Sequence, residues 1–279
     1  MPDAAPTDDA RRWFAVLGAA CGRINEQAKA MTPAERAANL GRGAGGDITA
    51  GIDRMAEDEI LAALRRLHHE DGRSMTLLSE ELGVLEIGGG GNPLVVCDPI
   101  DGSQNAKRGG PGFATAVGVS DGPTMSGVRL AMVHDHGTGE CFTAERGVGV
   151  WLNGVALRPP DPPARLRLLG VEGGGPAKLT AILAELSGQV SRVRSMGSLA
   201  LSIVWVAMGR FDGLVGLGAA RSVDVAAAQL IASELGCIVG LPTAGDTGSS
   251  PLDMGSRRRV VASASPELMA ELVRASGAI

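Results

Sequence analysis

A short apolar run at 94–97 ends in the hexapeptide 98–103, Asp-Pro-Ile-Asp-Gly-Ser, and this junction constrains the fold more than any other feature of the sequence. The run reads as a strand, and a carboxylate that directly follows a strand points from a rigid scaffold into a loop. Proline fixes φ after Asp98, and glycine allows a sharp turn after Asp101, so the two aspartates can converge. Taken alone, Asp-Pro and Asp-Gly are also common turn dipeptides.

Two further acidic positions follow the same pattern. Glu80 and Glu81 end the apolar run 75–78, and Asp224 opens a predicted helix over 223–235. Carboxylates that are held together repel one another unless a cation lies between them. Ligation by oxygen alone, with no His or Cys cluster nearby, favours a hard ion such as Mg²⁺. Taken singly, a Glu-Glu pair is typical of a solvated face and a helix-opening Asp is typical of a cap. The metal site is predicted by their combination.

The chain divides at a proline-rich segment, 159–163, which is its best linker candidate. Before it, short β-rich segments broken by glycine indicate an antiparallel meander; after it, strands and helices alternate. We therefore predict an α+β metal-binding domain over 1–158 and an α/β domain over 164–279 that completes the active site. The expected helices are 9–20, 52–67 with Thr49 as N-cap, 177–186, 199–208 and 223–235; the expected strands are 75–78, 94–97, 113–119, 127–133, 140–144, 148–152, 166–171, 192–196 and 213–217.

Composition argues against several other classes of protein. The 279 residues carry a net charge of -5 and only 3% aromatic residues, with no Tyr, which disfavours a nucleic-acid partner. The longest uncharged stretch, 195–209, is shorter than the ~20 residues of a membrane span. The N-terminus lacks the basic start and apolar core of a secretory signal, so we expect a cytoplasmic protein. The cysteines lack metal-ligand spacing, and we expect them as free thiols: Cys21, Cys97, Cys141 and Cys237. His134 and His136 also lack metal-ligand spacing, and we expect them at the surface.

Six sequence blocks, in order, resemble the motifs of the inositol monophosphatase family, within the superfamily of lithium-sensitive, magnesium-dependent sugar phosphatases. The resemblance extends from about residue 40 to residue 240. The hexapeptide 98–103 matches the D-P-[IL]-D-G-[TS] signature of the family and is a fairly specific block. The other blocks are 47–53 (Asp-Ile-Thr-Ala-Gly-Ile-Asp), 79–81 (Ser-Glu-Glu), 147–154 (Gly-Val-Gly-Val-Trp-Leu-Asn-Gly), 197–200 (Gly-Ser-Leu-Ala) and 223–228 (Val-Asp-Val-Ala-Ala-Ala).

The resemblance implies the layered αβαβα sandwich of this family, a small phosphorylated substrate, two or three Mg²⁺ ions and a homodimer. Asp98 would bridge two metals, and Asp53 and the Ser103 hydroxyl would orient the attacking water. Glu80 is assigned to catalysis as well as to the metals. The implied metal ligands are Glu80, Asp98, Asp101, Asp224 and the Ile100 carbonyl; the implied phosphate and substrate ligands are Asp101, Gly102, Ser103, Gly197, Ser198 and Arg221.

The sequence differs from the family at positions that are implied to bind the substrate. Leu217 stands where animal inositol enzymes carry a Glu that binds inositol hydroxyls, which disfavours inositol phosphate as the dedicated substrate. The segment 221–224 is closer to prokaryotic and archaeal members that also hydrolyse fructose 1,6-bisphosphate. Lys107, Arg108 and Arg221 lie near the motifs and are candidates to read a second phosphate, although a solvated surface position is favoured for Arg108. Further departures are Ala106, Val223 and Ala228.

Two alternatives remain beside a sugar, polyol or nucleoside phosphatase. The first is a 3′(2′),5′-bisphosphate nucleotidase, in which Lys-Gly-Phe usually follows the signature; Gln104-Asn105-Ala106 follows it here. The second is a non-catalytic protein that binds metal or phosphate on the same fold. The presence of every acidic ligand counts against this second alternative.

Overall fold

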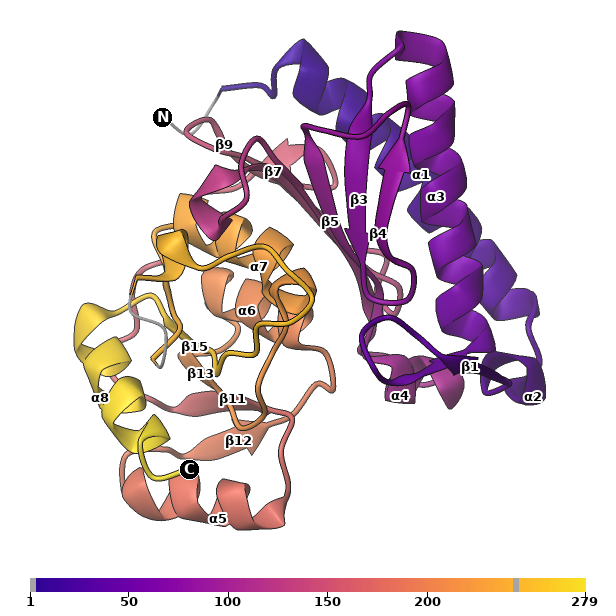
Figure 1. Cartoon of the computed structure of the whole chain (residues 1–279). Helices are drawn as coiled ribbons and strands as arrows, with labels where there is room; N and C mark the ends of the chain where they lie inside the picture. The colour runs from indigo at the N-terminus through magenta and orange to yellow at the C-terminus, as the bar shows by residue number, and fades with distance from the viewer. Residues whose placement is uncertain (1–3, 243–245) are drawn as a thin grey trace.

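An eight-stranded sheet dominates the first half of the chain in the computed structural model, which describes residues 4–242 and 246–279 (Figure 1). β3 and β5 pair in parallel, and the other neighbouring strands of this sheet pair antiparallel. In spatial order its strands are β10 (Val155–Ala156), β9 (Gly149–Leu152), β8 (Cys141–Glu145), β7 (Val128–Asp135), β6 (Ala114–Ser120), β5 (Leu94–Asp101), β3 (Met75–Ser79) and β4 (Gly83–Ile87).

A five-stranded sheet forms in the second half of the chain. β11 pairs in parallel with β12 and β13, whereas β15 pairs antiparallel with β13 and β14. In spatial order its strands are β12 (Arg192–Arg194), β11 (Leu168–Glu172), β13 (Gly213–Gly216), β15 (Val261–Ser263) and β14 (Ile238–Gly240).

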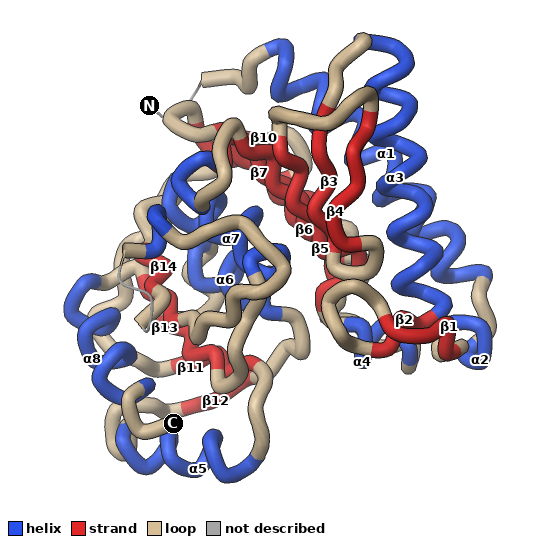
Figure 2. The backbone as a smooth tube through the Cα atoms, in the orientation of Figure 1, coloured by secondary structure: helices blue, strands red, loops and turns tan. Residues whose placement is uncertain are grey.

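Three layers of helices complete an αβαβα sandwich (Figure 2). α1 (Asp8–Ala30) and α3 (Gly51–Asp71) cover the outer face of the large sheet. α6 (Leu199–Ala207) and α7 (Ser222–Glu234) lie between the two sheets, and α5 (Pro176–Glu185) and α8 (Pro266–Ser276) cover the outer face of the small sheet. The remaining short elements are α2 (Pro33–Arg36), the hairpin of β1 (Asn39–Arg42) and β2 (Ile48–Ala50), and α4 (Ser103–Lys107).

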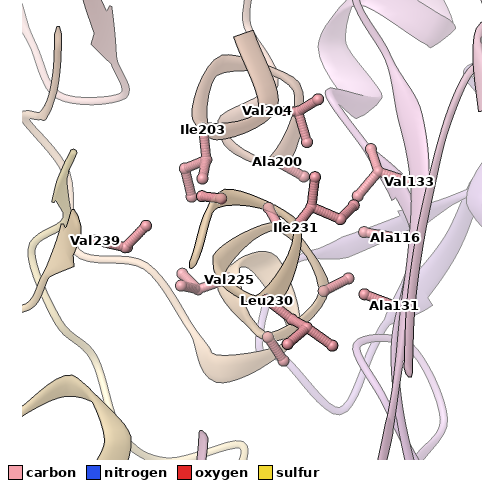
Figure 3. Packing of buried hydrophobic residues seen from close by; sticks show 14 of the residues in the cluster. Ala116, Ala131, Val133, Ala200, Ile203, Val204, Val225, Leu230, Ile231 and Val239 are labelled. Atoms are coloured by element: carbon pink, nitrogen blue, oxygen red, sulfur yellow. The ribbon is translucent and has the colours of Figure 1, made fainter. Parts of the chain in front are cut away.

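Side-chain alternation along the strands separates the hydrophobic cores. In β5, Val95 and Cys97 pack with α1 and α3, whereas Val96 packs with the helices between the sheets. Figure 3 shows Ile231 of α7 close to Val133 of the large sheet. Burial on both sides of α6 and α7 explains why residues 199–207 and most of 225–232 are apolar.

The sequence located the main elements but misplaced one helix cap. The predicted meander is confirmed as β6 to β9, and the linker candidate 159–163 lies in the loop between β10 and β11. The assignment of Thr49 as N-cap was wrong, because Ala50 occupies that position and Asp53 accepts its backbone N–H at 2.9 Å. The Thr49 hydroxyl donates to Glu81 instead.

The histidines at the end of β7 are not surface residues. His136 is buried, with its Nε2 2.8 Å from the Thr115 hydroxyl and its Nδ1 3.0 Å from Oδ1 of Asn25. Burial lowers the pKa of His136 to about 3, so the ring is neutral. The surface assignment of His136 was wrong because Asn25 of α1 contacts one side of its ring and Phe113 stacks on the ring face. His134 is half-buried.

The four cysteines are unpaired, as the sequence predicted. Cys21, Cys97, Cys141 and Cys237 are free, and all but Cys141 are fully buried. Among the helices of residues 4–242 and 246–279, none has the length and apolar character needed to cross a bilayer.

Candidate active site

Three carboxylates from separate elements converge at one edge of the large sheet. Asp98 lies in β5 on the same face as Val96, because successive side chains alternate, and this face is turned toward α7. Glu80 directly follows β3, the parallel neighbour of β5, and Asp224 is the third residue of α7. One oxygen from each of these three carboxylates lies within 4.8 Å of the other two. The structure thus brings Glu80, Asp98 and Asp224 together, as predicted.

Asp101 joins this site from the end of the same strand. The pairing of β5 with β6 shifts register between Asp98 and Asp101, which re-aims Asp101. Its Oδ2 accepts hydrogen bonds from the Ser198 hydroxyl and from the Ala200 backbone N–H, both at 2.6 Å. Gly102 follows with φ 96°, and a Cβ there would lie 2.6 Å from the Gly112 carbonyl oxygen, so the turn requires glycine.

Asp224 and Arg221 connect the carboxylates to the rest of the molecule. Asp224 accepts the backbone N–H of Arg221, the N-cap residue of α7, at 2.7 Å, while its carboxylate faces the cluster. The Arg221 guanidinium pairs with Glu80 and with Asp47, and the Arg221 side chain is 11% exposed. Asp47 is therefore engaged in an ion pair, and the charge of Arg221 is already opposed by two carboxylates. Contact between Arg221 and a substrate phosphate stays a prediction.

Burial raises the pKa of every carboxyl group in this cluster. Burial and the charge of Asp224 raise the pKa of Glu80 to about 8, although Arg221 opposes the change. Burial and the charge of Glu80 raise the pKa of Asp98 well above its usual range. Burial raises the pKa of Asp101 to about 7 and also raises the pKa of Asp224. A cation would favour the ionised forms, and carboxylate oxygens at this spacing suit a hard divalent ion such as Mg²⁺.

Asp53 and α4 form a second part of the site. Asp53, the third residue of α3, uses Oδ2 to accept the Ala50 backbone N–H, while its buried Oδ1 has no hydrogen-bond partner among the described residues. The Nζ of Lys107, at the end of α4, lies 3.7 Å from Oδ2 of Asp53. The Ser103 hydroxyl, at the start of α4, donates to the Ile100 carbonyl at 3.2 Å. The charge of Asp53 contributes to the raised pKa of Asp98, so the two parts are electrostatically connected.

Glu172 at the end of β11 supports the site, although the sequence analysis missed it. Its carboxylate accepts the backbone N–H of Met196 at 2.6 Å, that of Gly197 at 3.0 Å and the Ser202 hydroxyl at 2.7 Å. The segment 196–202 also contains Ser198, whose hydroxyl donates a hydrogen bond to Asp101. Glu172 is buried, and burial raises its pKa against these hydrogen bonds. Its signal was an acidic residue that ends an apolar strand, the same pattern that identified Glu80.

A cleft opens beside Asp101 and Asp224. It is lined also by Gln104, Gly197 and Leu199. Leu217, which replaces the acid expected of an inositol-binding site, is instead buried in the hydrophobic core between the small sheet and α5 and α8. The carboxylates therefore lie at one end of a space that can admit a small molecule.

Comparisons with known proteins show the family to which this chain belongs. A family model described as the inositol monophosphatase family matches residues 14–279. A fructose-1,6-bisphosphatase/inositol-1-monophosphatase from Methanothermobacter thermautotrophicus is 32% identical over 245 residues, covering 83% of this chain and 84% of the relative. The Nus factor SuhB of Pasteurella multocida is 33% identical over 203 residues, covering 69% of this chain and 71% of the relative.

Solved structures give the same result for the fold. The crystal structure of an inositol monophosphatase-fructose 1,6-bisphosphatase matches with a TM-score of 0.79 at 25% identity, over 94% of this chain and 99% of the other. A Thermotoga maritima IMPase matches with a TM-score of 0.75 at 23% identity, over 96% of each chain.

Sandwich, carboxylate cluster and relatives together define an enzyme of the phosphoric monoester hydrolase class. More narrowly, the chain belongs to the inositol monophosphatase family, because the family model matches nearly its whole length.

Proposed function

We propose that this phosphatase is Mg²⁺-dependent and hydrolyses the phosphomonoester of a small sugar, polyol or nucleoside. The observation that carries the proposal is the convergence of Glu80, Asp98 and Asp224 within 4.8 Å. Phosphate monoester hydrolysis depends mostly on positioning and on neutralising charge. Two or three Mg²⁺ ions bound at these carboxylates would activate water and neutralise the phosphate and the leaving oxygen.

Each residue of the site has a role in this proposal. Glu80, Asp98, Asp101 and Asp224, with the Ile100 carbonyl, would hold the ions. Asp53 and Ser103 orient the attacking water, and the unpartnered Oδ1 of Asp53 is an acceptor available for it. The remaining predicted roles, in phosphate and substrate binding, fall to the backbone N–H groups of Gly102 and Ser103, to Gly197 and Ser198, and to Arg221.

The proposal extends to the setting of the enzyme. Names that combine fructose-1,6-bisphosphatase and inositol-1-monophosphatase, as carried by the archaeal relative, support a sugar or polyol phosphate. We also infer a cytoplasmic homodimer, and an active site built jointly by residues 1–158 and 164–279. The location of Asp98 in the first range and Asp224 in the second supports the joint site.

Phosphate release tests the proposal directly. The substrate panel is inositol 1-phosphate, fructose 1,6-bisphosphate, glycerol 2-phosphate, adenosine 5′-monophosphate and 3′-phosphoadenosine 5′-phosphate, each with Mg²⁺ and with EDTA. We expect release from one or two compounds that requires Mg²⁺. Release that EDTA leaves unchanged would contradict the metal dependence. Silence throughout the panel, from protein that still binds Mg²⁺, would leave two candidates: a phosphatase with a narrow biosynthetic substrate outside the panel, or a binding protein that kept its metals.

A further inference from the structure

The buried acid that is proposed to orient the attacking water has an unusual neighbour. Asp53 is 3% exposed, and burial raises its pKa while the Ala50 N–H and then Lys107 lower it. The Lys107 side chain is 19% exposed, with its Nζ 3.7 Å from Oδ2 of Asp53. Lysines are scarce in this chain, at 29, 107 and 178 only. A buried carboxylate requires a counter-charge or hydrogen bonds, and Lys107 supplies the counter-charge here.

The short helix α4 explains how Lys107 reaches this carboxylate. Residues four apart lie on the same face of a helix, so Ser103 and Lys107 both face α3. The charge of Lys107 also lowers the pKa of Glu81, which burial raises. Lys107 therefore lies beside Asp53, an acid outside the proposed set of metal ligands.

We propose that Lys107 is a positioning residue of the reaction, holding the Asp53 carboxylate in the orientation that accepts a hydrogen bond from the attacking water. This role rests on the proposed function. In it, Lys107 helps to orient the attacking water through Asp53 and does not bind a second phosphate of the substrate. Lys107 and the Ala50 N–H both approach Oδ2 of Asp53, which leaves the buried Oδ1 for the water. The lysine acts through Asp53, so it affects the rate of the chemical step and not substrate binding.

Steady-state kinetics of Lys107→Met against wild type test this role. We expect kcat to fall roughly 10- to 100-fold with KM within about twofold, because positioning of the water is lost and substrate contacts are kept. Lys107→Arg retains the positive charge and should recover most of kcat. Lys29→Met, the same change at an exposed lysine of α1, should match wild type. Far-UV circular dichroism and thermal unfolding verify that the variants fold, and Lys107→Gln, which also removes the charge, replaces Lys107→Met if that variant does not fold.

A double-mutant cycle with Asp53→Asn shows whether the lysine acts through the acid. If it does, adding Lys107→Met to Asp53→Asn should cost no further activity. Multiplied losses in the double variant would overturn the role, as would a raised KM with normal kcat or a Lys107→Met variant as active as Lys29→Met. A wild-type protein that releases no phosphate would instead remove the proposed function, and this role with it.

Discussion

Asp98 and Asp53 are equally buried, at 3% exposure each, but within the part of the chain that the structure describes only Asp53 has a cationic side chain beside it. Asp53 has Lys107 beside it. Asp98 has no Lys, Arg or His nitrogen within 4.0 Å among residues 4–242 and 246–279, and its nearest charged neighbours are other acids. Arg221 pairs with Glu80 in the same cluster, but Asp98 itself has no such partner among the described residues. A buried acid without a cation beside it is one whose charge a metal can balance, whereas an acid beside a lysine already has a counter-charge. The comparison separates residues that hold ions from a residue that directs water.

Replacing Asp98 should have the largest effect. Asp98→Asn should reduce turnover by about 10³-fold or more, because it removes the proposed bridging charge between the ions. Stability in EDTA should be unchanged or higher, since a buried charge is removed. Phosphate release with Mg²⁺ and thermal unfolding in EDTA measure the two quantities. A folded Asp98→Asn enzyme with near-normal turnover would contradict the role of Asp98 in holding the ions.

Weakening the support of Asp101 should have a smaller effect. Glu172→Gln turns one accepting oxygen into a donor that faces the N–H and hydroxyl groups of 195–202, which loosens the segment that holds Asp101. We expect kcat to fall roughly tenfold and the Mg²⁺ concentration for half-maximal rate to rise. Glu185→Gln, an exposed change at the end of α5, is the matched control. Equal kinetics for the two variants would show that Asp101 needs no such support.

The raised pKa values predict how stability depends on pH without metal. Glu80 and Asp101 have pKa values of about 8 and about 7 in the folded state, above their ordinary values of 4.5 and 3.8. Between the ordinary and the raised pKa values, the folded state therefore binds more protons than the unfolded state. The free energy of unfolding should therefore fall as pH rises from about 5 to 8. We expect the Tm in EDTA to fall by roughly 5 °C or more over this range, and Mg²⁺ at pH 8 to restore it.

The same titration sharpens the comparison through one variant. Asp98→Asn should make the Tm depend less on pH. The variant removes one negative charge from the cluster, so the pKa values of the remaining carboxyl groups are raised less. Differential scanning calorimetry in EDTA measures it. A wild-type Tm that stays constant from pH 5 to 8 would contradict the raised pKa values.

The smallest effect is expected at Ser103. Ser103→Thr restores the commoner family residue and keeps the hydroxyl, so kcat should stay within about twofold of wild type. Ser103→Ala is the informative contrast, because it removes the hydroxyl from the face of α4 that also carries Lys107. A Ser103→Thr variant slowed tenfold would indicate that the site has no room for the added methyl group.

Much of the site was predictable because its chemistry is local in sequence. The hexapeptide 98–103 and the pair at 80–81 carry strand end, turn and ligand in a few consecutive residues. Glu172 and Lys107 were harder, because their partners lie on other elements, and only the packing of β11 against 195–202 and of α4 against α3 creates the contacts.

The fold was predictable to a similar degree. The glycine-bounded β-rich segments predicted the meander, whereas the short strands β4, β14 and β15 were missed. Helix α8 was also missed, although Ser265 caps it and Pro266 begins it. Thr49 illustrates the same limit of local reasoning: its hydroxyl is taken by Glu81, a residue distant in sequence, and Asp53 caps the helix instead.

Magnesium binding tests the central claim most directly. Isothermal titration calorimetry of Mg²⁺ into EDTA-stripped wild type and Asp98→Asn, at fixed pH and without substrate, measures the metal affinity apart from turnover. The account predicts binding to wild type and affinity at least tenfold weaker in Asp98→Asn. Equal affinity in the two proteins, or no binding to wild type, would contradict it.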